Sequence, residues 1–271
     1  MTTILKEIEI TGKSLMKNRQ SCVRVLPSNE GFIRFFVENS LEPIVANVDN
    51  VVSTNHCITL GIKRNKIMLT EHFMAACAFC GINSIDVHIS KPEIPILDGS
   101  AKKWVALFNE AGIEKVKKKE FYTVSEPVYY INGKTHLIIL PDEELSITYA
   151  VNYDHPDLKN KWISLDKKNL NEIIEARTFG FLKDLKKFQL FGFARGVTYE
   201  NTVGLDGEGY TTELRSEFEP IKHKILDLIG DLYLTGVNPL DLKAQIIVKE
   251  AGHAVHVKAA KMLKEKMRGK K

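Results

Sequence analysis

The hydrophobic pattern of this chain switches repeatedly between the two-residue repeat of a strand and the 3.6-residue repeat of a helix. In the first half, a continuous apolar run predicts a helix over 71–80, which Thr70 caps and Gly81 ends. A second helix is expected to start after its cap, Ser100, and to run to about residue 111. The predicted strands of this half cover 4–10, 22–27, 31–37, 47–53, 57–61, 65–69 and 85–89.

The second half shows the same kinds of pattern in a similar order. The Asn132–Gly133 pair predicts a hairpin turn between two of its strands. The order helix–strand–helix at 71–111 recurs at 220–268. The predicted strands cover 122–131, 135–140, 145–151, 162–165, 178–181 and 243–248, and the predicted helices cover 169–175, 183–190, 220–235 and 253–268.

This recurrence predicts an α+β fold made of two similar, layered β-α-α-β domains. Several strands precede the helices in each copy, and one such layer cannot cover its own sheet face. The two copies are therefore expected to pack against each other. The short charged segment 115–120 has little to bury and is the predicted boundary. It divides the chain into an N-terminal domain, 1–117, and a C-terminal domain, 118–271.

The composition is that of a folded protein with substantial cores, since 44% of the 271 residues are hydrophobic. The formal net charge is +4, and it is unevenly spread. Residues 258–271 contain seven Lys or Arg and one Glu, so the rest of the chain sums to −2. Such a run is either a solvated helix end that favours the helix dipole or a contact for phosphates or an anionic surface.

The four cysteines, Cys22, Cys57, Cys77 and Cys80, give no sign of a disulfide framework. Cys77 and Cys80 form a C-x-x-C within an apolar helical run, which predicts small core residues rather than a metal site. The first residues lack the apolar core of a signal peptide, and the longest uncharged apolar stretch, 73–85, is too short to span a bilayer. We therefore expect a soluble, cytoplasmic protein.

The predicted helix 220–235 contains an unusual row of ionisable residues. At 3.6 residues per turn, His223, Asp227 and Asp231 lie above one another on one face, and apolar residues fill most of the rest. A helix that is apolar nearly all round is buried, and buried ionisable groups are costly unless they are satisfied. Two interpretations stay open. Either His223 and Asp227 bind one metal ion, or they form an i, i+4 pair beside a solvated Asp231.

A metal site needs at least one more ligand, and His72 stands out because it follows Glu71 at a helix start. Three protein ligands with an open fourth position are typical of a catalytic zinc, although iron and cobalt suit the same donors. Glu71 is then the natural general base. His253 opens the last predicted helix, where it could act as an acid or bind an anion. Each remaining histidine is expected to be an ordinary core or surface residue.

Five segments carry a resemblance to known proteins: TEHFMAA at 70–76, PEIPILDGS at 92–100, ARTFGF at 176–181, HKILDLIGDL at 223–232 and GH at 252–253. Together they resemble the signature segments of the UDP-3-O-acyl-N-acetylglucosamine deacetylases, the zinc enzymes of the committed step of lipid A synthesis. They occur in the family's order and at similar spacing, so the resemblance covers nearly the whole chain. Glu71-His72 alone would not be specific, whereas the combination is.

The resemblance implies a two-domain enzyme with its active site between the domains. It places zinc, the implied cofactor, on His72, His223 and Asp227. It makes Glu71 the base that activates the zinc-bound water. The implied reaction is hydrolysis of the N-acetyl group of UDP-3-O-acyl-N-acetylglucosamine, with release of acetate.

The resemblance also implies roles for residues around the metal. Thr178 would help to stabilise the oxyanion of the tetrahedral intermediate. His253, oriented by Asp231, would protonate the leaving amine. Lys224 and Phe179 would contact the nucleotide sugar.

The acyl chain of the implied substrate needs a passage of its own. The segment 145–165, which includes Asp154-His155-Pro156, would correspond to the insert that forms this passage in the family. Asp184 matches another family position near the substrate. The implied partner is the acylated UDP-amino sugar, and we expect a monomer that binds no nucleic acid.

The chain departs from the family pattern in three places. Met16 stands within 12–18 where the family usually has a histidine, and 195–201 and 213–220 also differ from the usual segments. None of these changes removes an implied zinc ligand or Glu71, so they bear on the substrate rather than on the metal chemistry. Two alternatives follow. One is a zinc deacetylase of the same fold for a different N-acetylated sugar nucleotide, and the other is a non-catalytic basic protein that binds nucleic acid or anionic lipid through 258–271.

Overall fold

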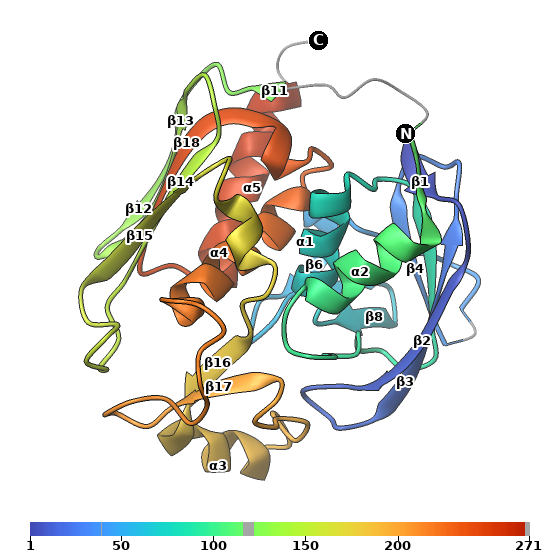
Figure 1. The fold of residues 1–271 in the computed structure, drawn as a ribbon. Helices are drawn as coiled ribbons and strands as arrows, with labels where there is room; N and C mark the ends of the chain where they lie inside the picture. Colours follow the sequence, from blue (N-terminus) through green and yellow to red (C-terminus); the bar gives the residue numbers. More distant parts are fainter. Residues whose placement is uncertain (39, 116–121, 269–271) are drawn as a thin grey trace.

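Two outer sheets enclose a central layer of helices, as Figure 1 shows. The computed structural model describes residues 1–38, 40–115 and 122–268. The sheet of the second half lies at the left of Figure 1 and the sheet of the first half at the right. The fold is therefore α+β, as predicted, but β-α-α-β is the layer order of the whole molecule and not of each half, because each half contributes one outer sheet and two helices. The four helices between the sheets are α1 (Glu71–Cys80), α2 (Lys102–Ala111), α4 (Glu219–Tyr233) and α5 (His253–Arg268).

The sheet of the first half has the strand order β2-β3-β9-β4-β5. Its strands are β2 (Ile8–Lys13), β3 (Gln20–Pro27), β4 (Ile33–Val37), β5 (Ile44–Val45) and β9 (Ile85–Ile89). Only β4 and β9 are parallel neighbours, and the other pairs are antiparallel. Alternate side chains of β3 and β4 are buried, which explains their two-residue hydrophobic pattern. A separate ribbon joins β1 (Thr2–Ile4) to β10 (Ile113–Lys115).

The sheet of the second half repeats this topology in the order β12-β13-β18-β14-β15. Its strands are β12 (Val128–Asn132), β13 (Thr135–Pro141), β14 (Ser146–Val151), β15 (Lys161–Asp166) and β18 (Leu242–Lys249), with β11 (Tyr122–Thr123) added beside β18. Again the third and fourth strands of the path, β18 and β14, are parallel and the other neighbours along the path are antiparallel, whereas the added β11 runs parallel to β18. The strand order thus repeats as the element order suggested. The division at 117/118 stays a prediction, because that boundary lies outside the described residues.

The two halves meet where α1 crosses α4. Every residue of α4 is buried, as the apolar pattern predicted. Gly230 makes the close approach possible, because a Cβ atom at this position would lie 2.0 Å from the carbonyl oxygen of Glu71. The backbone of α4 therefore touches the first turn of α1, and the polar face of α4 lies next to the N-terminus of α1.

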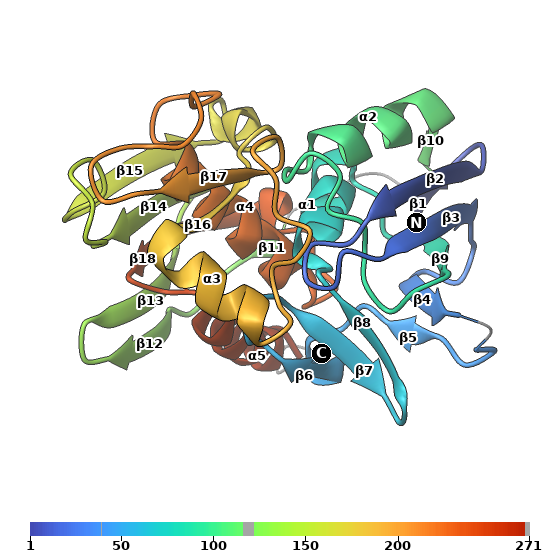
Figure 2. The same ribbon diagram turned by 90° about the horizontal axis from the view of Figure 1, so that it is seen from below.

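Each half carries an insert between the fourth strand of its sheet and its first helix. In the first half, the insert is η1 (Val48–Asn50) followed by a three-stranded sheet of β6 (Val51–Ser53), β7 (Thr59–Ile62) and β8 (Asn65–Met68). In the second half, it is η2 (Leu170–Ile173), β16 (Thr178–Phe181), α3 (Leu182–Leu190) and β17 (Thr202–Leu205), with β16 and β17 paired in parallel. Both inserts lie on the side of the molecule that faces the viewer in Figure 2.

Some predicted elements differ in the structure. The stretch 169–175 forms only the 3-10 turn η2, in which Leu170 and Ile173 are buried at the i, i+3 spacing of that helix. Thr70 has helical backbone angles, and its side chain makes no capping hydrogen bond, because capping needs an extended residue. The second helix begins at Lys102, whose N–H donates to the hydroxyl of Ser100. The strands β5, β10 and β17 were not predicted.

The cysteines and the C-x-x-C pair follow the prediction. Cys57, Cys77 and Cys80 are buried with free thiols, and burial raises the pKa of the Cys80 thiol to about 11. A short 3-10 turn, η3 (Pro239–Asp241), precedes β18.

No helix among the described residues is both long and apolar enough to cross a lipid bilayer.

Candidate active site

A cavity of ≈ 500 Å³ lies between the two halves, where α1, α4 and β16 come together. Asp231 lies one helical turn beyond Asp227, and its carboxylate accepts a hydrogen bond from Nδ1 of His253. Asp184 is in the first turn of α3 and is not among the described residues that line the cavity. The other predicted site residues do line it: Glu71, His72, Thr178, Phe179, His223, Lys224, Asp227 and His253.

Local backbone geometry places the first-half residues at the cavity. Leu69 has a positive φ of 62°, which a bulky L-residue rarely adopts, and this turn joins β8 to α1. Glu71 and His72 therefore stand in the first turn of α1, buried and next to α4. Such strained residues cluster at functional sites, where the surrounding structure holds them in place.

His72, His223 and Asp227 form a compact cluster of possible metal ligands. Their ligand atoms all lie within 4.8 Å of one another. Oδ1 of Asp227 is 3.4 Å from Nε2 of His223 and 3.6 Å from Nε2 of His72. It is buried and has no hydrogen-bond partner among the described residues, whereas Oδ2 accepts from the ammonium of Lys224 at 3.2 Å.

These separations fit a metal ion. In a tetrahedral site with bonds of about 2.1 Å, neighbouring ligand atoms stand about 3.4 Å apart. Both measured separations are close to that value and are longer than a good hydrogen bond. An orphaned carboxylate oxygen that faces two imidazole nitrogens is the donor set that a divalent cation would satisfy.

The environment of His223 leaves it ready to act as a ligand. Its Nδ1 lies 3.0 Å from the carbonyl oxygen of Ala176, which can only accept, so Nδ1 carries the proton and Nε2 presents a lone pair. Burial lowers the pKa of His223 to about 4, against the opposing charge of Asp227. Burial alone would raise the pKa of the Asp227 carboxyl, but the neighbouring His223 and Lys224 hold it well below the usual range.

Glu71 is a buried carboxylate next to this cluster. Its Oε2 accepts the backbone N–H of Ile58 at 3.1 Å. Burial raises the pKa of Glu71 to about 6, although the charges of His253 and His72 act to lower it. A carboxyl group with a pKa in this range can take and return a proton near neutral pH.

Asp231 lies at the centre of a second cluster, which is a hydrogen-bond network. Its Oδ2 accepts from Nδ1 of His253 and from Nδ1 of His256, both at 2.8 Å. The hydroxyl of Tyr149 lies 3.0 Å from Nε2 of His256 and 2.9 Å from the carbonyl oxygen of Ala251. Because both imidazole–carboxylate distances are those of charge-assisted hydrogen bonds, this group needs no metal ion to explain it.

This network decides the charge of His253. Burial lowers the pKa of His253, but the carboxylates of Asp231 and Asp227 outweigh burial and raise it to about 9. Burial lowers the pKa of His256, which therefore stays neutral. Sequence reasoning missed His256 and Tyr149. The i, i+3 spacing of His253 and His256 at a helix start, which brings both rings over one turn, was the available signal.

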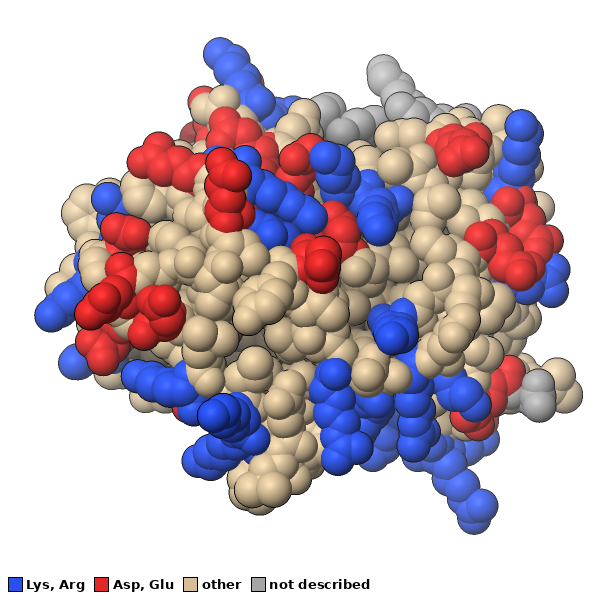
Figure 3. All heavy atoms as spheres, turned by 60° about the horizontal axis from the view of Figure 1, so that its bottom comes forward, with Lys and Arg blue, Asp and Glu red and all other residues tan. Residues whose placement is uncertain are grey.

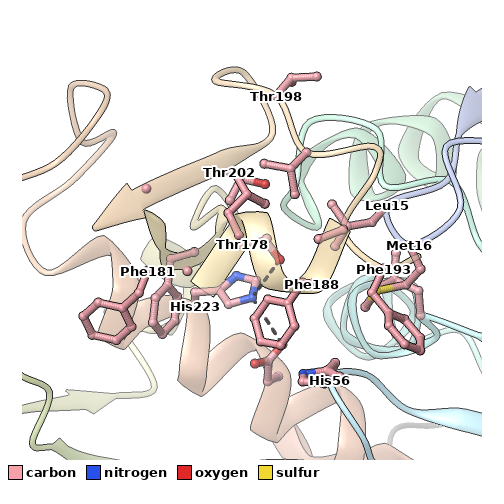
Figure 4. Close-up of a pocket in the computed structure, with 18 of the residues that line it drawn as sticks. Leu15, Met16, His56, Thr178, Phe181, Phe188, Phe193, Thr198, Thr202 and His223 are labelled. Atoms are coloured by element: carbon pink, nitrogen blue, oxygen red, sulfur yellow. Dashed lines mark hydrogen bonds and ion pairs between the residues drawn. The ribbon is translucent and has the colours of Figure 1, made fainter. Parts of the chain in front are cut away.

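Thr178 faces the same space as the metal-ligand cluster. Its hydroxyl lies 3.3 Å from Nε2 of His223, and Figure 4 shows the two side chains together. Its backbone N–H donates to the carbonyl oxygen of Gly99 at 2.8 Å. Gly99 has a φ of 83°, and a Cβ atom there would lie 1.8 Å from the carbonyl oxygen of Asn201, so this tight packing requires glycine.

Two ion pairs lock the segments around the site. Arg177, which precedes Thr178, forms a buried pair with Glu219 at the start of α4, at 2.9 Å. Arg215 reaches across to Asp98 of the first half at 2.8 Å. The first bond therefore ties the segment 176–181 to α4, and the second ties the segment before α4 to the segment 92–100.

The cavity continues from the metal-ligand cluster into an apolar arm. Its wall comes from both inserts and from the N-terminal segment, and the ring of His56 meets Phe188 edge-on at 4.8 Å. Phe181 lies on one side in Figure 4, and Leu15, Met16 and Phe193 lie on the other. The apolar lining includes Leu15, Met16, Phe181, Leu182, Leu185, Phe188 and Phe193.

The prediction that 145–165 forms the acyl-chain passage finds no support in the lining of this cavity. That segment contains β14 and β15 of the second sheet, and none of its residues is among those that line the cavity. His155 is buried and bonds to the carbonyl oxygen of Gly209 at 2.8 Å, which is a structural contact. The apolar arm is lined instead by α3 and its flanking segments, together with the N-terminal segment and the first insert.

A cluster of two histidines and an aspartate, with the buried carboxylate of Glu71 and the Asp231-bound imidazole of His253 beside it, is the kind of site that metal-dependent hydrolases use. Comparison with known proteins agrees with this class. The chain belongs to the family of UDP-3-O-acyl N-acetylglycosamine deacetylases, whose family model matches residues 1–265. This is a family of metalloenzymes.

Curated relatives cover nearly the whole chain. A UDP-3-O-acyl-N-acetylglucosamine deacetylase of Thermodesulfovibrio yellowstonii is 34% identical over 97% of this chain and 91% of its own length. One from Leptospira biflexa is 32% identical over 98% of this chain and 90% of its own length. One from a Nostoc species is 31% identical, with 96% and 97% covered.

Proposed function

We propose that this protein hydrolyses the N-acetyl group of UDP-3-O-acyl-N-acetylglucosamine, releases acetate and so acts in lipid A biosynthesis. Family membership and the activity in the relatives' names support this proposal. The observation that carries it is that one cavity holds Glu71, the His72–His223–Asp227 cluster and His253 and then extends into an apolar arm. In this proposal an N-terminal domain supplies Glu71 and His72, and a C-terminal domain supplies the remaining groups.

His72, His223 and Asp227 would hold the metal, for which we propose zinc. Two neutral imidazoles and one carboxylate suit zinc and leave a fourth position open. Zinc in this place would supply a Lewis acid that lowers the pKa of water to about 7 and polarises the amide carbonyl. Lys224 holds Oδ2 of Asp227, so that Oδ1 points to the cluster.

Glu71 is the proposed general base. Its carboxylate lines the cavity beside His72, and its one backbone bond, to Ile58, fixes Oε2 while Oε1 stays available. The raised pKa of Glu71 lets it accept a proton from the attacking water and later return it. Thr178 donates its hydroxyl to the oxyanion that develops on the acetyl carbonyl.

His253 is the proposed acid for the leaving amine. Its Nδ1 is bound to Asp231, so the proton that faces the cavity is on Nε2. Because its pKa is about 9, the imidazolium persists at neutral pH and can give this proton to the amine nitrogen. His256 orients Asp231, and Tyr149 in turn holds His256, so both are positioning residues.

Substrate binding is assigned to the walls of the cavity. Lys224 and Phe179 would contact the sugar nucleotide, and the ring of Phe179 already meets the ring of His223 edge-on at 5.9 Å. The acyl chain would occupy the apolar arm under α3, where burial of each methylene contributes about 0.8 kcal/mol. Asp184 does not line the cavity and takes no part in this proposal.

The test is acetate release by the purified, zinc-loaded protein from UDP-3-O-acyl-N-acetylglucosamine, with the unacylated sugar nucleotide as comparison. Release from the acylated compound, loss on chelation and recovery on addition of zinc are expected. Equal release from both compounds would favour a deacetylase for a different N-acetylated sugar nucleotide. Release from neither, in a protein that binds one zinc per chain, would overturn the proposed reaction and leave the metal site standing.

A further inference from the structure

The outer face of α3 and the residue after it form an exposed apolar tip. None of the nine residues of α3 is buried. Leu190 is 82% exposed and Phe191 is 65% exposed, side by side at the end of the helix. Adjacent large apolar residues at the surface mark an interaction site, whereas single ones are ordinary. We call Leu190 and Phe191 the α3 tip.

Basic side chains surround the α3 tip. Residues 182–195 contain four basic residues and one acidic residue, Asp184. Lys17 joins them from the N-terminal segment, because its ammonium lies 3.1 Å from the carbonyl oxygen of Gly192. Figure 3 shows Lys and Arg side chains on both sides of an uncharged projection in the lower part of the molecule, while most acidic side chains lie higher up, apart from a few at the lower right.

The inner face of the same helix belongs to the cavity. Leu182, Leu185 and Phe188 line the apolar arm, whereas Leu190 and Phe191 do not. One short helix therefore has an apolar inner side over the arm and an apolar tip in solvent, with lysines between them. This arrangement of an apolar end flanked by lysines is typical of segments that lie in the interface of a membrane.

We propose that the α3 tip docks the protein on an anionic lipid membrane. Leu190 and Phe191 enter the headgroup region, and Lys183, Lys186 and Lys187 bind lipid phosphates. The arm then opens close to the bilayer surface, where an acylated amphiphile is concentrated. This last consequence rests on the proposed function, but the membrane contact itself does not.

Lipid fits this surface better than the other anionic partners. A nucleic acid would pair with the lysines but would leave Leu190 and Phe191 in water. An acidic protein could cover both groups, but it would not need lysines spread around an apolar tip. Basic residues near an anionic bilayer each add to the affinity, and the contribution is screened by salt.

The experiment is vesicle flotation of the full-length, zinc-loaded protein. Vesicles of phosphatidylethanolamine with phosphatidylglycerol are compared with vesicles of phosphatidylcholine alone, at low and at high salt. The wild type should float with the anionic vesicles at low salt and stay behind in the other conditions. Failure to bind the anionic vesicles, or equal binding to phosphatidylcholine, would overturn the proposal, and in the first case an acidic protein becomes the better partner.

Paired variants test which residues make the contact. L190S/F191S and K186E/K187E should each weaken binding to anionic vesicles, the second by about 30-fold because two lysine contacts are lost. I131S/W162S is the matched apolar control, because these residues are 62% and 69% exposed on the second sheet. K134E/K261E is the charge control. Equal loss in a control and in its matching α3 variant would overturn the assignment to α3.

The proposed function is checked separately in the same proteins. With a short-acyl, soluble substrate and no vesicles, all four variants should release acetate at the wild-type rate, because none of the changed residues lines the cavity. Vesicle binding by a wild type that releases no acetate would remove the proposed function and keep the membrane contact. Acetate release by a wild type that does not bind vesicles would overturn only the proposed membrane contact.

Discussion

The two halves of the molecule share one sheet topology, but their inserts differ in how they pack and in how much of the cavity they line. The insert of the first half is a small sheet whose apolar residues Leu60 and Ile67 are fully buried in the core. The insert of the second half contains α3, which has no buried residue and whose inner side lines the cavity. The same position in a repeated fold thus supplies mainly buried core in one copy, with His56 as its contribution to the described cavity lining, and a large part of the apolar cavity wall in the other.

The helices differ in a similar way. The first half contributes Glu71 and His72 from the first turn of α1, because this helix begins at the cavity. The second half contributes His223, Asp227 and Asp231 from the interior of α4. The N-terminus of α1 and one face of α4 therefore form a single site only because the two helices are in contact. The close crossing of α1 and α4 is thus required for the site in the same way as the ligand residues themselves.

The largest effect is expected from E71Q, which tests the contribution of the first half. Glutamine keeps an oxygen for the N–H of Ile58 but cannot take a proton, so kcat should fall by about 10³-fold. Metal content, measured by atomic absorption, should stay at the wild-type value. The control is E93Q, a buried acid of the same half that accepts from the N–H of Met16 and does not line the cavity. Full kcat in E71Q would show that the base assignment is wrong.

A smaller loss is expected from D231N, which tests the second half. His253 loses the charge that holds its pKa at about 9, so burial lowers that pKa. The acid is active only when protonated, and activity of the wild type should therefore persist up to about pH 9 and fall above it. In D231N the falling limb of kcat/KM against pH should move to lower pH, with about a 10²-fold loss at pH 8. An unmoved limb would remove His253 from the role of acid.

Sequence reasoning located the elements that have sharp physical limits. The apolar run at 71–80 ends at Gly81, which adopts the left-handed conformation, and the strand 178–181 and the helix 253–268 have the predicted bounds. The row His223–Asp227–Asp231 on a buried helix predicted a polar site before any partner was known. These features are local, so a single sequence carries them.

The parts that were missed depend on contacts between distant segments. β17 has no two-residue pattern, because all four of its residues are buried and its partner β16 lies more than twenty residues earlier. The family resemblance predicts the acyl-chain passage at 145–165, yet β14 and β15 pair there in regular antiparallel register. His256 was taken for an ordinary histidine because its partners, Tyr149 and Asp231, come from two other elements.

The contact between the halves can be weakened directly with G230A. The added methyl group would lie 2.0 Å from the carbonyl oxygen of Glu71, so α1 and α4 must separate. Overpacking of this kind destabilises a protein by roughly 1–3 kcal/mol, and the shift of Glu71 should also lower kcat. G209A is the control, because no atom lies within 4 Å of the added methyl group. Urea unfolding measures both, and equal stability of G230A and the wild type would contradict the tight crossing.

The smallest effect is expected in the insert that distinguishes the second half. F188A removes a ring that lines the apolar arm and contacts His56, but Phe188 is only partly buried, so stability should change little. Loss of its contact with an acyl chain should raise KM for the long-acyl substrate by about tenfold, since burying a large apolar side chain contributes about 1.5–3 kcal/mol. V52A, in the corresponding insert of the first half and away from the cavity, is the control. A short-acyl substrate that does not reach Phe188 should show no change in F188A, because the lost contact lies in the arm and not at the metal-ligand cluster. An equal rise in KM for both substrates would place the acyl chain elsewhere and remove the functional difference between the two inserts.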